Sequence, residues 1–147
     1  RLKEFNSMDK IQFISIDPIK HIHLKNFDLE FIATSHSIPE PYSILINTKY
    51  GKLLHTADWK IDDNPTLGAN FDTNSFKKIG SEGLLALIGD STNADIPGYS
   101  QSELEVREEL IKLFSRYHQR IVITCFSSNI ARMESIAIAA KKNNQLW

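Results

Sequence analysis

Short apolar runs separated by turn-forming residues occupy the first ninety or so positions and indicate a unit rich in β-strands. Their length and composition predict strands over residues 11–16, 27–33, 43–47, 52–56 and 84–88. The third and fourth form a hairpin, because Lys49-Tyr50-Gly51 offers a glycine-bearing turn between them. The last run contains no polar residue, which predicts a strand buried on both faces. Residues 62–71 and 90–99 are expected to be loops.

The spacing of apolar residues becomes helical after residues 98–102, where we place a domain boundary. Ser102 and Glu105 form a capping-box signature that opens a helix reaching about residue 118. Residues 121–126 are predicted to be another buried strand, and Ser127-Ser128-Asn129 caps a helix that runs to about residue 142. A strand, a cap and a helix make half of a βαβ unit, so we predict that a parallel α/β sheet begins here.

The composition of the chain is that of a globular protein, with 147 residues, 41% hydrophobic and 24% charged. A net charge of −1 gives no overall basic field, although a few placed cations suffice for a local phosphate-binding groove. The lone Cys125 excludes an internal disulfide and indicates a reducing, cytoplasmic location. No apolar run reaches the roughly 18 residues of a membrane span, and no leader is recognisable. The chain opens on Arg1 and its first methionine is Met8, which we interpret as a segment of a longer protein.

Three polar strings follow predicted strands and carry side chains of the kinds that bind metal ions. They are S-H-S-I-P-E at residues 35–40, H-T-A-D-W-K-I-D at 55–62 and G-D-S-T-N-A at 89–94. His36, Asp58 and Asp90 therefore follow strand ends of one sheet, where they can converge on one ion. Two of these residues also have an ordinary alternative when taken singly: a surface or core histidine for His36, and a turn or cap residue for Asp58.

Taken together, these strings resemble motifs of the ribonuclease J family of metallo-β-lactamase-fold nucleases. S-H-S-I-P-E is similar to the family's third metal motif and H-T-A-D-W-K-I-D to its fourth. The similarity continues, in order, through Pro65, Gly68, I-G-S-E-G (79–83), D-S-T-N-A (90–94), P-G-Y-S-Q-S-E (97–103) and F-S-S-N-I-A-R (126–132). The resemblance implies an α/β fold in two parts. Residues 1–98 would be the C-terminal part of the first metallo-β-lactamase segment, within an αββα sandwich, and residues 99–147 the start of a β-CASP α/β domain.

The implied activity is hydrolysis of RNA by two zinc ions per intact site, with manganese or magnesium as alternative metals. His36 would be a metal ligand, and Asp58 a catalytic carboxylate that bridges both ions. Asp90 would be a second catalytic residue, which orients a histidine from later in the chain and helps to protonate the leaving 3′-oxygen. The family cuts RNA internally and also degrades it in the 5′→3′ direction, in RNA processing and decay. The resemblance further implies a homo-oligomer for the intact protein.

RNA contacts are implied for Ser128, Asn129 and Arg132, at the start of the last predicted helix. Unpaired N–H groups and the helix dipole favour a phosphate there. Simple helix capping is the alternative for Ser128 and Asn129. For Arg132 the alternative is an ion pair with Glu134 or with another acidic residue.

The chain also departs from the family pattern. The principal metal motif, H-x-H-x-D-H, is absent, and His21-Ile22-His23 does not replace it, because Lys25 and Asn26 stand where Asp and His are required. We expect His21 and His23 to face solvent. Ala57 replaces the glycine usual before Asp58, and a positive φ there would strain the loop. We therefore expect the isolated chain to be inactive. The other readings are a related β-CASP nuclease that acts on DNA, and a truncated, non-catalytic RNA-binding remnant.

Overall fold

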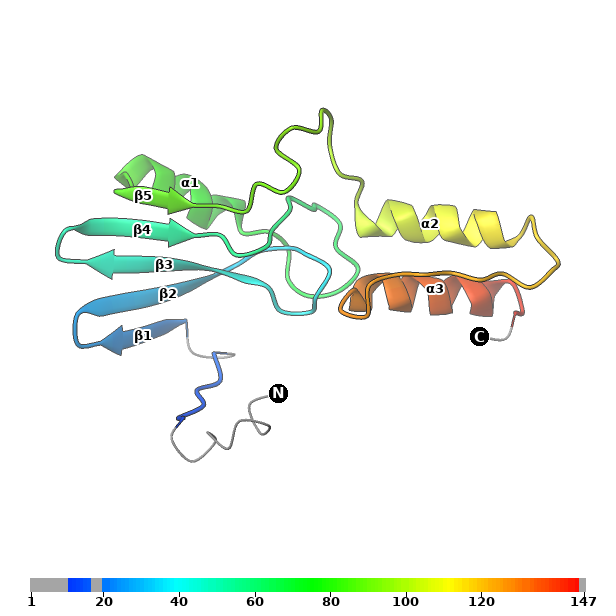
Figure 1. Ribbon diagram of the computed structural model, residues 1–147, viewed down its shortest axis with the longest axis horizontal. Coiled ribbons are helices and arrows are strands. Elements are labelled where there is room, and N and C mark those ends of the chain that lie inside the picture. Colours follow the sequence, from blue (N-terminus) through cyan, green and yellow to red (C-terminus); the bar gives the residue numbers. More distant parts are fainter. Residues whose placement is uncertain (1–10, 17–19, 146–147) are drawn as a thin grey trace.

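The computed structural model describes residues 11–16 and 20–145, which form one five-stranded sheet and three helices (Figure 1). The strands are β1 (His21–Leu24), β2 (Phe27–Ala33), β3 (Tyr42–Thr48), β4 (Gly51–His55) and β5 (Ala86–Ile88). The helices are α1 (Thr73–Glu82), α2 (Glu103–Phe114) and α3 (Ile130–Lys142). The sheet and α1 lie at one end of the molecule, and α2 and α3 at the other (Figure 1). The predicted α/β class is thus confirmed.

The strands follow one another across the sheet in chain order. Neighbouring strands from β1 to β4 are antiparallel, whereas β5 pairs with β4 in parallel, with Leu54 opposite Leu87. The predicted hairpin is confirmed as β3 and β4, in which Thr48 pairs with Gly51 across the turn. Because β2 and β4 are each antiparallel to β3, and β5 is parallel to β4, these three strands run in one direction. Their carboxyl ends therefore lie along one rim of the sheet.

One face of the sheet is covered by α1, a helix that the apolar pattern did not predict. Ile32, Leu45 and Leu54 come from three neighbouring strands and form a buried cluster with Ile79 of α1. Leu84 and Phe76 pack against the same cluster. Only a few apolar residues on α1 take part, so its sequence carries too short a periodic pattern to be recognised.

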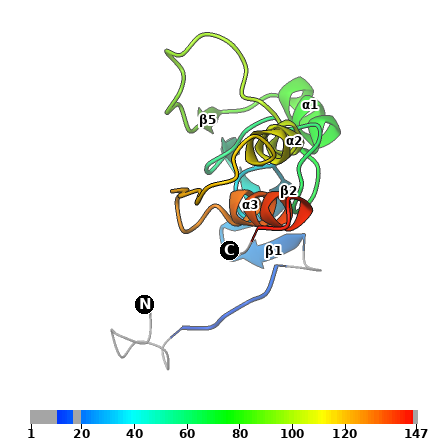
Figure 2. The ribbon, with the colours of Figure 1, turned by 90° about the vertical axis from the view of Figure 1, so that its right-hand side faces the viewer.

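The helices α2 and α3 pack against each other, as the end-on view in Figure 2 shows. Their buried residues Phe114, Ala139 and Ala140 form a cluster of their own, separate from the core under the sheet. Both predicted caps are confirmed: Ser102 makes a complete capping box with Glu105, and Asn129 caps α3. The helix α2 ends at Phe114, one turn before the predicted end. No helix in the described part of the chain is long and apolar enough to cross a membrane.

The predictions of strands over residues 11–16 and 121–126 are wrong. A strand is stabilised by hydrogen bonds to a neighbour, and no described segment pairs with either run. Most of their apolar side chains are exposed instead, with Phe13 at 59%, Val122 at 83% and Phe126 at 84%. The parallel sheet predicted for the second unit is therefore not formed by the described residues.

The prediction of a doubly buried strand over residues 84–88 is only partly correct. The strand β5 covers residues 86–88, and Leu87 and Ile88 are 63% and 51% exposed. This exposure follows from its place at the edge of the sheet, where only β4 pairs with it among the described residues. By contrast, the expectation for His21 and His23 is confirmed, because both lie exposed on β1.

Candidate metal centre

Three loops at the common rim of β2, β4 and β5 enclose the candidate site. His36 follows β2, Asp58 follows β4 and Asp90 follows β5. All three residues line one cavity of about 670 Å³, together with Trp59, Lys60, Ile61 and the loop residues Ser91, Thr92, Asn93, Ala94, Gly98, Tyr99 and Ser100. The structure thus brings together the residues that the sequence placed at three strand ends.

His36 is half-buried and held by its neighbour. Its Nδ1 atom lies 3.0 Å from the Ser37 hydroxyl, with which it shares a hydrogen bond. When Ser37 accepts this bond, Nδ1 carries the proton and Nε2 keeps its lone pair, which is the form in which imidazole binds a metal. The loop that carries His36 also packs closely on Gly68, whose φ is 81° and where an added Cβ would lie 2.2 Å from the Pro39 carbonyl oxygen.

Asp58 is exposed at the tip of a tight turn. The preceding residue, Ala57, has a φ of 53°, so the expected positive φ is present. Its backbone N–H donates to His55 Nδ1 over 3.1 Å, and this bond holds the turn. On the other side, Trp59 packs on Phe71, with ring centroids 5.9 Å apart. The carboxylate of Asp58 is thus presented by a strained turn that is anchored to the body of the protein.

Asp90 is fixed within its own loop. Its Oδ1 atom accepts hydrogen bonds from the Thr92 hydroxyl at 2.6 Å and from the Thr92 N–H at 3.0 Å. These bonds hold the pKa of Asp90 below its ordinary value, and the charge of protonated His36 lowers it further. The backbone N–H of Asp90 also donates to the hydroxyl of Thr56, at the end of the neighbouring strand β4. Asp90 is therefore an anion at neutral pH and lines the same cavity as His36.

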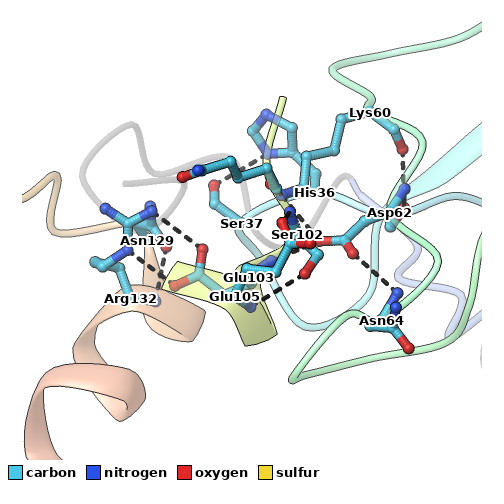
Figure 3. A network of polar contacts seen from close by, with 12 residues as sticks. His36, Ser37, Lys60, Asp62, Asn64, Ser102, Glu103, Glu105, Asn129 and Arg132 are labelled. Carbon is cyan, nitrogen blue, oxygen red and sulfur yellow. Dashed lines mark hydrogen bonds and ion pairs between the residues drawn. The ribbon is translucent and has the colours of Figure 1, made fainter. Parts of the chain in front are cut away.

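Two acidic residues beside the cavity were not identified from the sequence. The Asp62 side chain is 1% exposed, pairs with Lys60 at 2.9 Å, and accepts the N–H of Glu103 at 3.0 Å (Figure 3). Burial by itself would raise the pKa of Asp62, but these bonds and one from the Asn64 N–H outweigh it, so the pKa is lowered. Glu103 is also buried, with a side chain that is 8% exposed. Asp62 is the last residue of the H-T-A-D-W-K-I-D string. Its contact with Glu103 joins residues 41 positions apart, so no local sequence pattern predicts it.

The residues predicted to bind RNA lie at the start of α3. Asn129 Oδ1 accepts the N–H of Arg132 at 2.9 Å, so Asn129 acts as a helix cap, while Ser128 is exposed. The Arg132 guanidinium forms two hydrogen bonds with Glu103, at 2.9 and 3.2 Å, and this pairing raises the pKa of Arg132. Glu134, the partner considered from the sequence, pairs with Arg107 instead. Binding of RNA by these three residues stays a prediction.

The donor atoms at the cavity suit zinc or manganese in kind, since they are one imidazole and two carboxylates. The hydrogen bond at His36 Nδ1 leaves Nε2 for a ligand, and Asp58 offers an exposed carboxylate. No group of three or more such side chains among the described residues is close enough to hold an ion. A structural zinc site has four ligands and a catalytic one has three from the protein, so these residues fit as part of a metal site and do not complete one.

Several curated proteins that are similar to this α/β unit carry the name ribonuclease J. No family model matches the chain. The chain is 47% identical over 120 residues to ribonuclease J of Sinorhizobium meliloti, in an alignment that covers 82% of the chain and 21% of that relative. It is 34% identical over 146 residues to ribonuclease J of Synechocystis sp., covering 99% of the chain and 23% of the relative. For ribonuclease J 1 of Streptococcus pyogenes the identity is 37% over 145 residues, with 99% and 26% covered.

These alignments confirm the resemblance found in the motifs. Nearly the whole chain is matched, and it spans only about a quarter of the length of these curated relatives. The chain therefore belongs to the ribonuclease J family as a partial segment.

Proposed function

We propose that this chain carries part of the active site of a metal-dependent ribonuclease, which hydrolyses RNA both internally and from the 5′ end in the 5′→3′ direction. The observation that carries the proposal is the meeting of His36, Asp58 and Asp90 at one cavity, within a chain related to ribonuclease J. In this proposal the sheet and α1 are part of a metallo-β-lactamase αββα sandwich. The helices α2 and α3 begin a β-CASP domain after residue 98.

Each residue has a distinct task in the proposed mechanism. His36, through Nε2, and the exposed carboxylate of Asp58 would hold the metal ions. A bound pair of zinc or manganese ions would supply a nucleophile at neutral pH and neutralise charge on the phosphate oxygens. Asp90, kept anionic by Thr92, would accept a hydrogen bond from a further histidine of the intact protein and hold that histidine ready to protonate the leaving 3′-oxygen.

The chain alone is proposed to be inactive, because the described residues do not bring together three metal ligands. We further propose that the intact protein is a cytoplasmic homo-oligomer. The same shortage of ligands supports a second function, that of a non-catalytic RNA-binding segment built on the start of α3. Under that alternative RNA would still be bound, but neither metal nor Asp58 would affect binding.

The test uses the longest reading frame that encodes this segment. Metal content and cleavage of 5′-monophosphorylated RNA are measured beside the variant Asp58→Ala, with Asp95→Ala as a matched control. Asp95 is an exposed acid in the same loop as Asp90, but it does not itself line the cavity. We expect about two ions per chain, with cleavage lost in Asp58→Ala and kept in Asp95→Ala.

Three results would count against the proposal. A metal-free, inactive protein that still binds RNA would favour the binding segment. Single-stranded DNA cleaved in preference to RNA would identify a DNA nuclease of the same fold. Equal cleavage of RNA by both variants would show that Asp58 does not belong to the active site.

A further inference from the structure

A closed ring of contacts joins the two loops that carry His36 and Asp58 to the amino ends of α2 and α3. Figure 3 shows the part of it that contains Asp62, Glu103 and Arg132. We call it the docking ring, and its members are Ser35, Ser37, Asp62, Glu103, Ala131 and Arg132. It contains residues from parts of the chain nearly one hundred positions apart. None of its members is one of the proposed metal ligands.

The first contact of the ring docks α2 on the Asp58 loop. Asp62 accepts the Glu103 N–H, which is one of the N–H groups at a helix start that have no partner within the helix. A carboxylate at a helix amino end is favoured both by this bond and by the helix dipole. Because the Asp62 side chain is only 1% exposed, water does not compete with its carboxylate for the Glu103 N–H.

The second contact joins α2 to α3. Arg132 donates from Nε and Nη2 to the two carboxylate oxygens of Glu103. This paired geometry fixes direction as well as distance, and it is made at the loop end of both helices. A second ion pair, between Arg107 and Glu134, joins the helices farther along without touching either loop.

The remaining contacts return to the His36 loop. The Ala131 N–H donates to the Ser37 carbonyl over 3.4 Å, next to His36. Ser35 then connects the two loops directly: its hydroxyl donates to the Lys60 carbonyl at 2.8 Å and accepts the Asp62 N–H at 3.1 Å. The ring is therefore closed, and a shift of the helices must be accommodated in both loops.

We infer that Asp62 is a positioning residue through which α2 and α3 set the relative placement of His36 and Asp58. The effect of this placement on metal binding rests on the function proposed above. The contacts of the ring are independent of that proposal. The helices would thereby couple the second unit of the protein to the site on the sheet. Asp62 does not itself line the cavity, although it also pairs with Lys60, which does.

The test compares amide hydrogen exchange in the longest reading frame that encodes the segment and in its Asp62→Asn variant. The asparagine keeps the size of the side chain but loses the charge that pairs with Lys60. We expect exchange at least tenfold faster at Glu103 and also at Ala131 and Lys60, whose N–H groups bond elsewhere in the ring. The matched control is Glu134→Gln, which removes the outer ion pair and should leave these three amides unchanged. Faster exchange at Glu103 alone would show that Asp62 acts only as a helix cap, and it would overturn the inference.

A zinc titration distinguishes positioning from folding. We expect the zinc dissociation constant of Asp62→Asn to rise at least tenfold and that of Glu134→Gln to stay unchanged. A role in folding alone would lower the folded fraction, measured by urea denaturation, without changing the affinity of the folded molecules. An unchanged affinity beside widespread faster exchange would therefore overturn the inference.

A second variant protects the test against a failure of Asp62→Asn to fold. Arg132→Lys keeps the charge but loses the paired geometry, and we expect faster exchange at Ala131 with weaker zinc binding. Unchanged exchange at Ala131 would show that the contact of Ala131 does not depend on Arg132, and it would overturn the inference. If the unaltered protein binds no zinc, the proposed function fails, and the exchange pattern alone decides whether the ring exists.

Discussion

The backbone N–H of Ala57 donates a hydrogen bond to His55 Nδ1 over 3.1 Å, while Ala57 itself is held at a φ of 53°. A side chain with a Cβ disfavours this backbone region by about 1–2 kcal/mol, and glycine does not. The residue before Asp58 therefore carries strain that the glycine usual at this position in the family would avoid.

Replacement of Ala57 by glycine should stabilise the protein. Relief of the strained φ is partly offset by the greater freedom of glycine in the unfolded chain, so we expect a net gain of about 0.5–1 kcal/mol. Urea denaturation measures it. The control is Ala94→Gly on an exposed loop, where φ is not positive and no gain is expected. Equal effects of the two changes would show that the turn at Ala57 is not strained.

Removal of the Arg132 guanidinium should cost more stability than removal of an exposed cation. Arg132→Met leaves Glu103 buried without its partner. Because Arg132 is 34% exposed, we expect a loss of about 2–3 kcal/mol, below the ~3–5 kcal/mol of a fully buried pair. Lys112→Met, which breaks an exposed pair with Glu109, should change the unfolding free energy little. Comparable losses in the two variants would contradict the burial of Glu103.

Acid should lower the unfolding free energy of the protein, partly because Asp62 becomes protonated. Its pKa is lower in the folded protein than the ordinary 3.8, so its stabilising contribution is complete above that value. The contribution is lost as the pH falls below about 4 and through the folded pKa. We expect Asp62→Asn to flatten the fall in unfolding free energy in this acid range, as followed by urea denaturation at successive pH values. An unchanged pH dependence would mean that Asp62 is not ionised in its buried position.

The start of α3 allows capping and RNA binding to be separated. Asn129→Ala removes the cap on the Arg132 N–H and should cost about 1 kcal/mol of stability. Ser128→Ala should leave stability unchanged, because the side chain is exposed. If Ser128 binds RNA, this variant instead weakens RNA binding, as a filter-binding assay would measure. Loss of RNA affinity only in Asn129→Ala, in proportion to its instability, would leave capping as the sole role.

The local signals in the sequence were reliable where a few adjacent residues decide the structure. The capping box at Ser102 and the turn before Gly51 are of this kind, and both are formed. The strand predicted over residues 121–126 failed, because an apolar run becomes a strand only when a neighbour pairs with it. The helix α1 was missed because few of its residues are apolar.

In the candidate site, too, features decided by adjacent residues were predicted and features that need distant partners were not. His36, Asp58 and Asp90 were found because each follows a strand directly, and strand direction determines which ends share a rim. The pair of Glu103 and Arg132 was not found, since 29 positions separate the two residues and neither belongs to a local pattern. Local sequence thus indicated the proposed site residues, whereas the contacts that hold their loops emerge only from the folded chain.

The close approach of Gly68 to Pro39 has a consequence for how this protein can vary. Gly68 is exposed, and a survey that equates surface position with freedom to change would expect any residue there. Its positive φ and the neighbouring carbonyl exclude every side chain from that point. Random mutagenesis should therefore show an intolerant position on the outside of the molecule, and solubility engineering of this loop must leave it untouched.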